Sequence, residues 1–237
     1  MKFITRLWGS SLGKKYLMAL SGIALWFFVI GHLLGNLQVF LGPDKINTYA
    51  AFLKSQPGLL WGARLGLLAM VALHVSSAIS LTNLNRNARP QPYGHPRAPF
   101  GSSYASRTMM MSGLIVAAFI IYHLLHYTVQ TPAVNLTGVD FSEYQEAVGT
   151  TTRHDVYRMI IIGFRHPLVS LFYIVAVGLL SLHLSHGLSS MFQSLGITRW
   201  SKTGRDCLAR TAGLITFVGY ASIPVAVLLG LGKEVVK

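Results

Sequence analysis

Long apolar stretches without charged side chains alternate with short polar segments along this chain. Five of these stretches contain no Asp, Glu, Lys or Arg, and each exceeds the roughly 20 residues that a helix needs to cross the hydrocarbon core of a membrane. They predict five membrane-spanning helices, at about residues 17–41, 62–85, 108–131, 166–193 and 210–232. The alternation of apolar and polar residues that a membrane β-barrel requires is missing. We therefore expect an all-α membrane bundle that forms a single domain over residues 1–237.

The composition agrees with this prediction. Of 237 residues, 52% are hydrophobic and 11% are charged, and the mean hydropathy is +0.49, whereas a soluble domain needs more polar surface. The polar segments are too short for a catalytic domain, and the longest, Asp140–Arg158, is expected to form a short interfacial helix. The single cysteine, Cys207, excludes a disulfide or a cysteine-ligated iron–sulfur cluster within the chain. No internal repeat is apparent.

The formal net charge of +13 is distributed as membrane topology requires. If the N-terminus lies in the cytoplasm, the cytoplasmic segments hold twelve basic residues and one acidic residue, Asp206, and the opposite segments hold eight basic and six acidic residues. The twelve are Lys2, Arg6, Lys14, Lys15, Arg86, Arg89, Arg97, Arg107, Arg199, Lys202, Arg205 and Arg210. The positive-inside rule then places the C-terminus outside. Topology explains the charge without a nucleic-acid partner, although a basic cytoplasmic face also suits a soluble protein partner.

Four histidines lie deep inside four different apolar stretches: His32, His74, His123 and His183. A histidine in hydrocarbon is costly and needs a partner, and haem iron accepts an imidazole on each face. Four ligands on four helices therefore predict two haem groups of the b type. A proton or cation transporter that uses the histidines as a relay is the main alternative. It is disfavoured because no Asp, Glu, Lys or Arg accompanies the histidines.

The depth of each histidine predicts which two share an iron. His32 and His123 lie about 15 residues from the cytoplasmic ends of their helices, and His74 and His183 lie about 10 residues from theirs, which at about 1.5 Å per residue separates the two levels by roughly 8 Å. Ligands of one iron must lie at the same level. We therefore predict an outer pair, His32 with His123, and an inner pair, His74 with His183.

Two further histidines and two glycines lie close to these predicted ligands. His126 and His186 follow the ligands of their helices by three residues, so they share a helix face with them and cannot supply the opposite face of the same iron. They are candidates to contact a haem propionate or a quinone, or are simply hydrogen-bonded interior residues. Gly31 and Gly35 flank His32 and would allow a porphyrin or a neighbouring helix to pack closely.

The sequences around the four histidines resemble a known family. The matching segments are residues 30–36 (IGHLLGN), 73–75 (LHV), 122–124 (YHL) and 183–196 (HLSHGLSSMFQSLG). They are similar to the membrane anchor of succinate:quinone oxidoreductases, the enzymes known as succinate dehydrogenase and fumarate reductase. The resemblance is to the single-chain, five-helix, dihaem cytochrome b558 type, and it covers nearly the whole chain.

This resemblance implies an electron-transfer role in the respiratory chain and the tricarboxylic acid cycle. It implies two haem b groups, a proximal one at His74 and His183 and a distal one at His32 and His123. A flavoprotein subunit and an iron–sulfur subunit would dock on the cytoplasmic side of a bacterial cytoplasmic membrane, and a quinone, usually menaquinone, would react near the distal haem. No succinate chemistry would occur in this chain. Some fumarate reductases of this class carry a glutamate at the position of Ser181, so their proton route is not expected here.

Quinone ligands and two alternative functions remain open. Asn36, Gln38 and Arg64 at the outer helix ends could donate hydrogen bonds to a quinone carbonyl, but the same residues could be interfacial groups at the helix ends. A cytochrome b anchor for another dehydrogenase, such as formate dehydrogenase or hydrogenase, would share the haem groups and the topology. A structural anchor without haem would keep the helices and lose the redox role.

Overall fold

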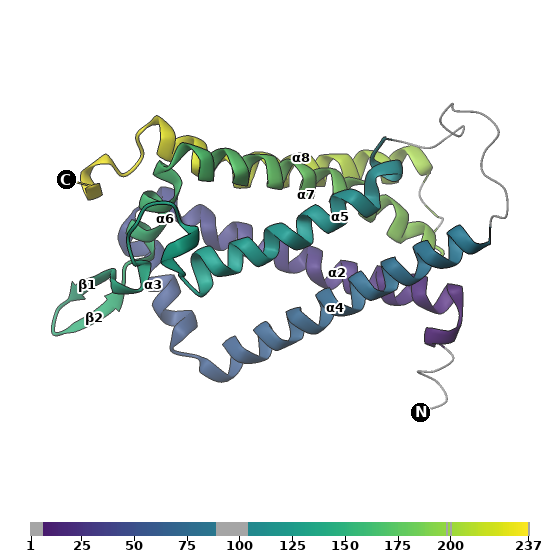
Figure 1. The fold of residues 1–237 in the computed structure, drawn as a ribbon, viewed down its shortest axis with the longest axis horizontal. Coiled ribbons are helices and arrows are strands. Elements are labelled where there is room, and N and C mark those ends of the chain that lie inside the picture. Colours follow the sequence, from purple (N-terminus) through teal and green to yellow (C-terminus); the bar gives the residue numbers. More distant parts are fainter. Residues whose placement is uncertain (1–6, 89–103, 198, 200, 237) are drawn as a thin grey trace.

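The computed structural model describes residues 7–88, 104–197, 199 and 201–236, which form a bundle of long helices (Figure 1). Five helical segments are long and apolar enough to cross a membrane: Ser11–Leu41, Pro57–Asn87, Arg107–Thr128, Pro167–Ser194 and Lys202–Leu229. They coincide with the five predicted spans, so the all-α multi-pass membrane fold is confirmed. α2 begins at one end of the bundle and α8 ends at the other (Figure 1).

The long helices are α2 (Ser11–Asn36), α4 (Pro57–Asn87), α5 (Tyr104–His123), α7 (Pro167–Ser194) and α8 (Lys202–Leu229). α8 packs along α7, α5 packs along α7, and α4 packs mainly along α2. Shorter elements connect them at one end: α3 (Pro43–Lys54), β1 (Gln145–Val148), β2 (Thr151–His154) and α6 (Val156–Arg165). We call this the hairpin end. The opposite end, where α2 begins, is the N-terminal end.

Several helices begin earlier than the apolar pattern predicts. α2 begins at Ser11 instead of near residue 17, and α8 begins at Lys202 instead of near residue 210. Ser10 and Ser201 cap these starts, because their side chains accept hydrogen bonds from the backbone N–H groups of Gly13 and Gly204. Charge-free windows therefore mark the part of each helix that suits hydrocarbon, whereas the helix itself continues to its cap.

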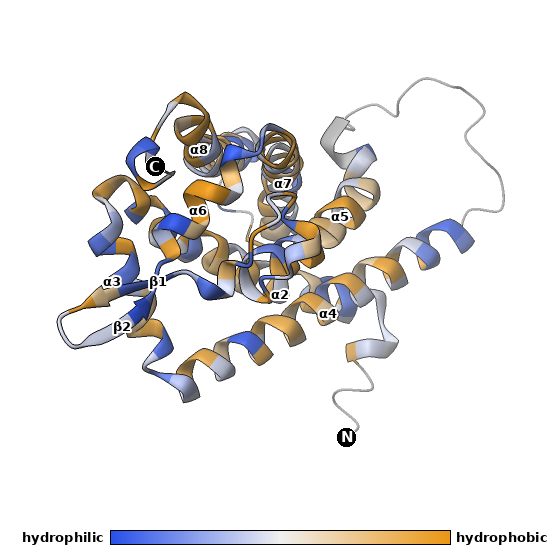
Figure 2. Cartoon of the chain, turned by 60° about the vertical axis from the view of Figure 1, so that its left-hand side comes forward, coloured by the Kyte–Doolittle hydropathy of each residue, from blue (hydrophilic) through white to orange (hydrophobic). Residues whose placement is uncertain are grey.

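Large apolar side chains face outward along the long helices. Leu68 of α4 is 65% exposed and Leu214 of α8 is 61% exposed, which is the pattern expected where lipid, not protein, covers a helix. Hydrophilic residues gather instead on α3 and the β-hairpin (Figure 2). Twelve buried residues form the protein core around α6 at the hairpin end: Val39, Ile46, Phe119, Tyr157, Ile160, Ile161, Phe164, Val169, Tyr173, Ala176, Ile223 and Val227.

The predicted interfacial helix over Asp140–Arg158 is wrong for most of that segment. Residues 145–148 and 151–154 form an antiparallel hairpin in which Val148 pairs with Thr151, and α6 begins at Val156. Gly149 begins the two-residue turn with φ +59°, a value that favours glycine and a tight hairpin. Residues 89–103, which join the second span to the third, lie outside the described residues.

Asn47 of α3 connects the hairpin to the bundle. Its side chain is fully buried, and its amide nitrogen donates hydrogen bonds to Glu146 (2.9 Å) and Asp155 (2.9 Å). Its amide oxygen accepts a hydrogen bond from the backbone N–H of Tyr157 (2.8 Å). One side chain thus joins α3 to β1, to the residue that follows β2 and to the first turn of α6.

The stability of this hairpin end should fall as the pH drops below about 6.5, the ordinary value for histidine. Burial, and then the charge of Lys54, lower the pKa of His154 in the folded state, and the amide nitrogen of Gln130 lies 2.9 Å from Nε2 of His154. The unfolded hairpin therefore takes up a proton at a pH where the folded one does not. Hydrogen exchange of the hairpin amides between about pH 7 and 5 measures this effect. His154→Gln should flatten the profile, and an unchanged profile in that variant would contradict the prediction.

Candidate functional site

The structure brings the four predicted ligand histidines together as two pairs. The rings of His32 on α2 and His123 on α5 have centroids 5.8 Å apart and planes at 81°. The rings of His74 on α4 and His183 on α7 have centroids 6.3 Å apart and planes at 66°. These are the pairs that helix direction and depth predict. Each pair joins two helices that are far apart in the sequence.

The spacing within each pair fits two axial ligands of one iron. Two iron–nitrogen bonds of about 2 Å, together with the distance from each nitrogen to its ring centre, place the centroids about 6 Å apart. Among the described residues, no group of three or more His, Cys, Asp or Glu side chains could hold a bare metal ion. Each pair offers two imidazoles, which is the protein ligand set of a bis-histidine haem.

The two pairs lie at different levels of the bundle. His74 lies beside Ser21 and Gly22 of α2, whereas His32 follows Gly22 by ten residues on the same helix. At 1.5 Å per residue, the levels are about 15 Å apart along the helix axis. The sequence-based estimate of roughly 8 Å is too small, because the charge-free windows place the start of α2 too late.

Hydrogen bonds around His74 assign its ring nitrogens. Nδ1 lies 3.1 Å from the carbonyl oxygen of Met18 and 3.3 Å from the hydroxyl oxygen of Ser21. A carbonyl oxygen accepts hydrogen bonds and cannot donate them, so Nδ1 carries the proton. The Ser21 hydroxyl donates to the carbonyl of Leu17 (2.7 Å), which leaves its oxygen free to accept. Nε2 of His74 therefore keeps its lone pair for a metal.

His183 has the same arrangement on another helix. Its Nδ1 lies 3.4 Å from the hydroxyl oxygen of Ser112 on α5, and this hydroxyl donates to the carbonyl of Met109 (3.1 Å). Nδ1 is again the donor and Nε2 the free nitrogen. Sequence reasoning missed Ser21 and Ser112. A signal was available, because in each of these two apolar helices the serine precedes a glycine directly.

The pair at the hairpin end has a different environment. His32 stacks on Phe28, with centroids 5.3 Å apart, and lies 6.3 Å from the ring of Tyr220 on α8. Nδ1 of His123 lies 3.4 Å from the hydroxyl of Tyr173 on α7. Tyr173 and Tyr220 belong to the surroundings of this pair and were not predicted from the sequence.

His126 lies apart from the ligand pair. A π-helical turn, Leu124–Thr128, follows α5, and within it His126 is fully buried. Its Nδ1 lies 2.9 Å from the Tyr173 hydroxyl, and its ring packs against that of Tyr127. Among the described histidines, the ring that lies against His32 is that of His123 and not that of His126. A π-helical turn of this kind often occurs at functional sites.

The other predicted neighbours make mainly local contacts. Nε2 of His186 lies 3.0 Å from the hydroxyl of Ser190, one turn further along α7. A Cβ atom added at Gly35 would lie 3.0 Å from the ring of Tyr49 on α3, whereas one added at Gly31 would meet no atom within 4 Å. Gly35 thus allows α3 to approach α2.

The three quinone candidates are not brought into one site by direct contacts. The side-chain amide of Asn36 donates to the carbonyl of His32 (2.7 Å), and Gln38 lies in the 3-10 turn Leu37–Leu41. Arg64 places its guanidinium 5.1 Å from the ring centre of Trp61. No hydrogen bond links the three side chains within the described part of the chain.

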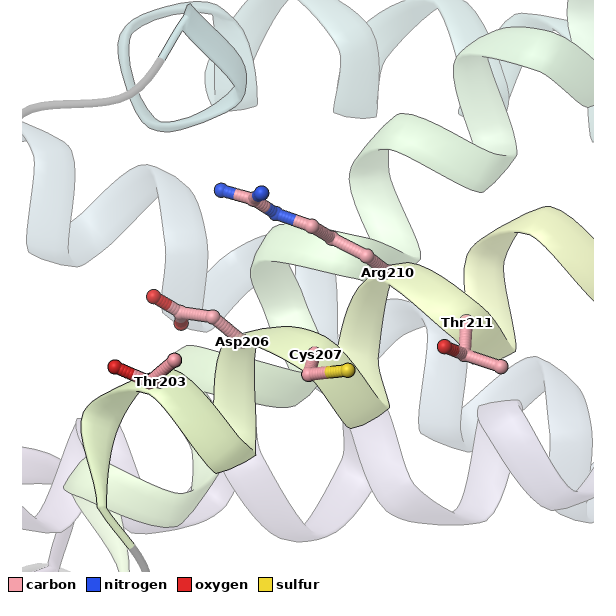
Figure 3. A pocket seen from close by; sticks show the side chains of 5 residues that line it. All are labelled: Thr203, Asp206, Cys207, Arg210 and Thr211. Carbon is pink, nitrogen blue, oxygen red and sulfur yellow. The ribbon is translucent and has the colours of Figure 1, made fainter.

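A surface pocket at the N-terminal end of α8 is separate from the histidines. It is lined by Thr203, Asp206, Cys207, Arg210 and Thr211 (Figure 3). Asp206 accepts hydrogen bonds here from Ser189 of α7 and from Lys202. The pocket contains none of the predicted site residues, so the two histidine pairs remain the candidate site.

No family model, curated protein or solved structure matches this chain. The functional assignment therefore depends on the geometry of the site itself. Two imidazole pairs, each at the spacing of a bis-histidine iron, lie at two levels between apolar helices. This arrangement is the feature that a function must explain.

Proposed function

We propose that this chain is a dihaem cytochrome b that anchors a succinate:quinone oxidoreductase in the membrane and passes electrons between an iron–sulfur subunit and a membrane quinone. The observation that carries the haem assignment is the meeting of four histidines from four helices in two pairs, 5.8 and 6.3 Å apart. The sequence segments around the same histidines support the succinate assignment through their resemblance to that family.

The chain's own residues have simple roles in this function. Nε2 of His74 and His183 would hold a proximal haem b, and His32 and His123 would hold a distal haem b. The haem groups supply reversible one-electron chemistry when bound. The apolar helices exclude water from both levels, and Ser21 and Ser112 hold the proton on the ring nitrogen that faces away from the iron.

The charge distribution supports the orientation and the partners. Twelve basic residues and one acidic residue belong to the N-terminal end and the segments that share its side, so we place this end in the cytoplasm of a bacterial cell. A flavoprotein and an iron–sulfur subunit would dock there, next to the proximal pair. A quinone, of the menaquinone type that the family resemblance implies, would react near the distal pair at the hairpin end.

Purification of the complex from its native membrane tests the proposal. A tag after Lys237 should bring down flavin-containing and iron–sulfur subunits with succinate:quinone reductase activity, and a pyridine haemochrome assay should give two haem b per chain. Succinate should reduce both haem groups. The matched control is His154→Ala, which changes a histidine outside the pairs and should keep both haem groups.

Each contrary outcome has a distinct meaning. Copurification of a molybdenum or nickel–iron enzyme, with haem groups that do not respond to succinate, would assign the chain to formate dehydrogenase or hydrogenase and overturn the succinate assignment. Absence of haem from the purified chain would overturn the cytochrome assignment altogether and leave a structural anchor.

A further inference from the structure

Two of the long helices repeat one pattern of residues. Residues 18–34 on α2 and 109–125 on α5 both read Met-x2-Ser-Gly-x5-Phe-x-Ile-x-His-Leu-Leu. The repeat aligns Gly22 with Gly113 and His32 with His123. The expectation that the chain has no internal repeat is therefore wrong for these two helices. Because the two copies run in the same direction through the bundle, each places the same side chains at the same level.

The Ser-Gly dipeptide of each copy contacts a histidine from another helix. A Cβ atom added at Gly22 would lie 3.3 Å from Cε1 of His74, and one added at Gly113 would lie 3.3 Å from Cε1 of His183. These separations are tighter than ordinary van der Waals contact. A larger residue would push on the imidazole, so the glycines let both rings lie against the helix backbone.

The serine and the glycine of each copy act on the same ring. Ser21 lies 3.3 Å from Nδ1 of His74, and Ser112 lies 3.4 Å from Nδ1 of His183. Each hydroxyl donates back to its own helix and offers its oxygen to the imidazole. The glycine limits the tilt of the ring, and the serine fixes which nitrogen carries the proton.

The described contacts of the histidines within the repeat, His32 and His123, include no Ser-Gly dipeptide. His32 and His123 instead face the phenylalanine of their own copy, Phe28 at 5.3 Å and Phe119 at 6.0 Å between ring centroids. α2 and α5 therefore each give one ligand to the pair at the hairpin end and one Ser-Gly dipeptide to the pair at the N-terminal end. The histidines at the two levels thus contact different kinds of residue.

We infer that two positioning dipeptides, Ser21-Gly22 and Ser112-Gly113, orient the two proximal ligand histidines. In this way they lower the reduction potential of the proximal haem relative to a site without them. This inference rests on the proposed haem function. A hydrogen bond from Nδ1–H to an acceptor raises the basicity of the ligating nitrogen. A more basic axial ligand favours ferric iron, so the potential falls.

The two serines should differ in their effect. His74 has a second acceptor, the carbonyl of Met18 at 3.1 Å, whereas Ser112 is the one hydrogen-bond partner of His183 among the described residues. Ser112→Ala should therefore raise the potential of the proximal haem more than Ser21→Ala does. Ser112→Thr keeps a hydroxyl and should restore a potential close to the original.

Redox titration and low-temperature spectra of the purified complex test this inference. The proximal component is first identified as the one that His74→Ala and His183→Ala remove. Gly22→Ala and Gly113→Ala should change the low-spin ferric signal of that component alone, because each moves one imidazole. Ser76→Ala and Gly66→Ala are the matched controls: Ser76 bonds to its own helix and is exposed, and Gly66 has no atom within 4 Å of an added Cβ.

The outcomes separate this inference from the function on which it rests. A wild-type chain without haem contradicts the proposed function. If the wild type binds two haem groups, then an unchanged proximal potential in both serine variants, or an equal shift of both components, overturns the inference. Loss of the proximal haem alone in Ser112→Ala, with recovery in Ser112→Thr, supports it, whereas loss of both haem groups in that variant contradicts it.

Discussion

Replacing His74 or His183 with alanine should remove the same one of two haem components and leave the other. In the proposed function each iron would have two protein ligands, and loss of one would leave a five-coordinate site that binds haem weakly. His32→Ala and His123→Ala should remove the second component, again the same one in both variants. About half of the haem should remain in each case. Redox titration of the four variants measures this result.

This experiment also tests the pairing and the choice between neighbouring histidines. If His74→Ala and His32→Ala removed the same component, the two ring pairs seen in the structure would not be the ligand pairs. His126→Ala and His186→Ala serve as controls and should keep both low-spin spectra. Bleaching in His126→Ala, with a normal spectrum for His123→Ala, would exchange the roles of these two residues.

Replacing Asn47 with leucine should destabilise the hairpin end by about 2–4 kcal/mol. Leucine has the same branching pattern at Cγ, but it leaves the buried N–H of Tyr157 without its acceptor and removes a donor from Glu146 and Asp155. An unpaired buried polar group costs about 1–3 kcal/mol. Denaturant unfolding in detergent, followed together with proteolysis of the hairpin, measures the loss.

The control for this variant is Ser55→Ala, at the C-cap that directly follows α3. The Ser55 hydroxyl is exposed and donates to the carbonyl of Phe52 (2.7 Å), so its loss should change the stability by less than about 0.5 kcal/mol. Equal stabilities for Asn47→Leu and the wild type would show that the buried amide does not hold the hairpin to α3.

The spans and the histidine pairs were predictable because they follow from one-dimensional rules. The membrane allows no unpaired backbone polar group, so a charge-free stretch of this length must be helical. Helix direction and a constant rise per residue then place His32 level with His123, and His74 level with His183. The distance between the two levels was less accurate, because it depends on where α2 begins, and the Ser10 cap determines that start.

The residues that contact the ligand histidines could not be predicted in the same way. Contacts such as those of Tyr173 with His123 and His126 join residues about fifty positions apart, and no periodicity along the chain specifies them. The hairpin over residues 145–154 was missed because a polar segment is compatible with a helix or with two short strands. Its Gly149 was the local indication, since glycine suits a two-residue hairpin turn.

The attachment of α4 has a consequence for how the protein matures. α4 packs mainly against α2, yet it carries His74, whose partner His183 lies on α7. One iron bound to both imidazoles would tie α4 to the rest of the bundle, so cofactor binding would add to the stability of the native state by mass action. The chain newly inserted in the membrane would then complete its assembly only as it acquires haem, and the apoprotein would be the form that membrane proteases recognise and remove.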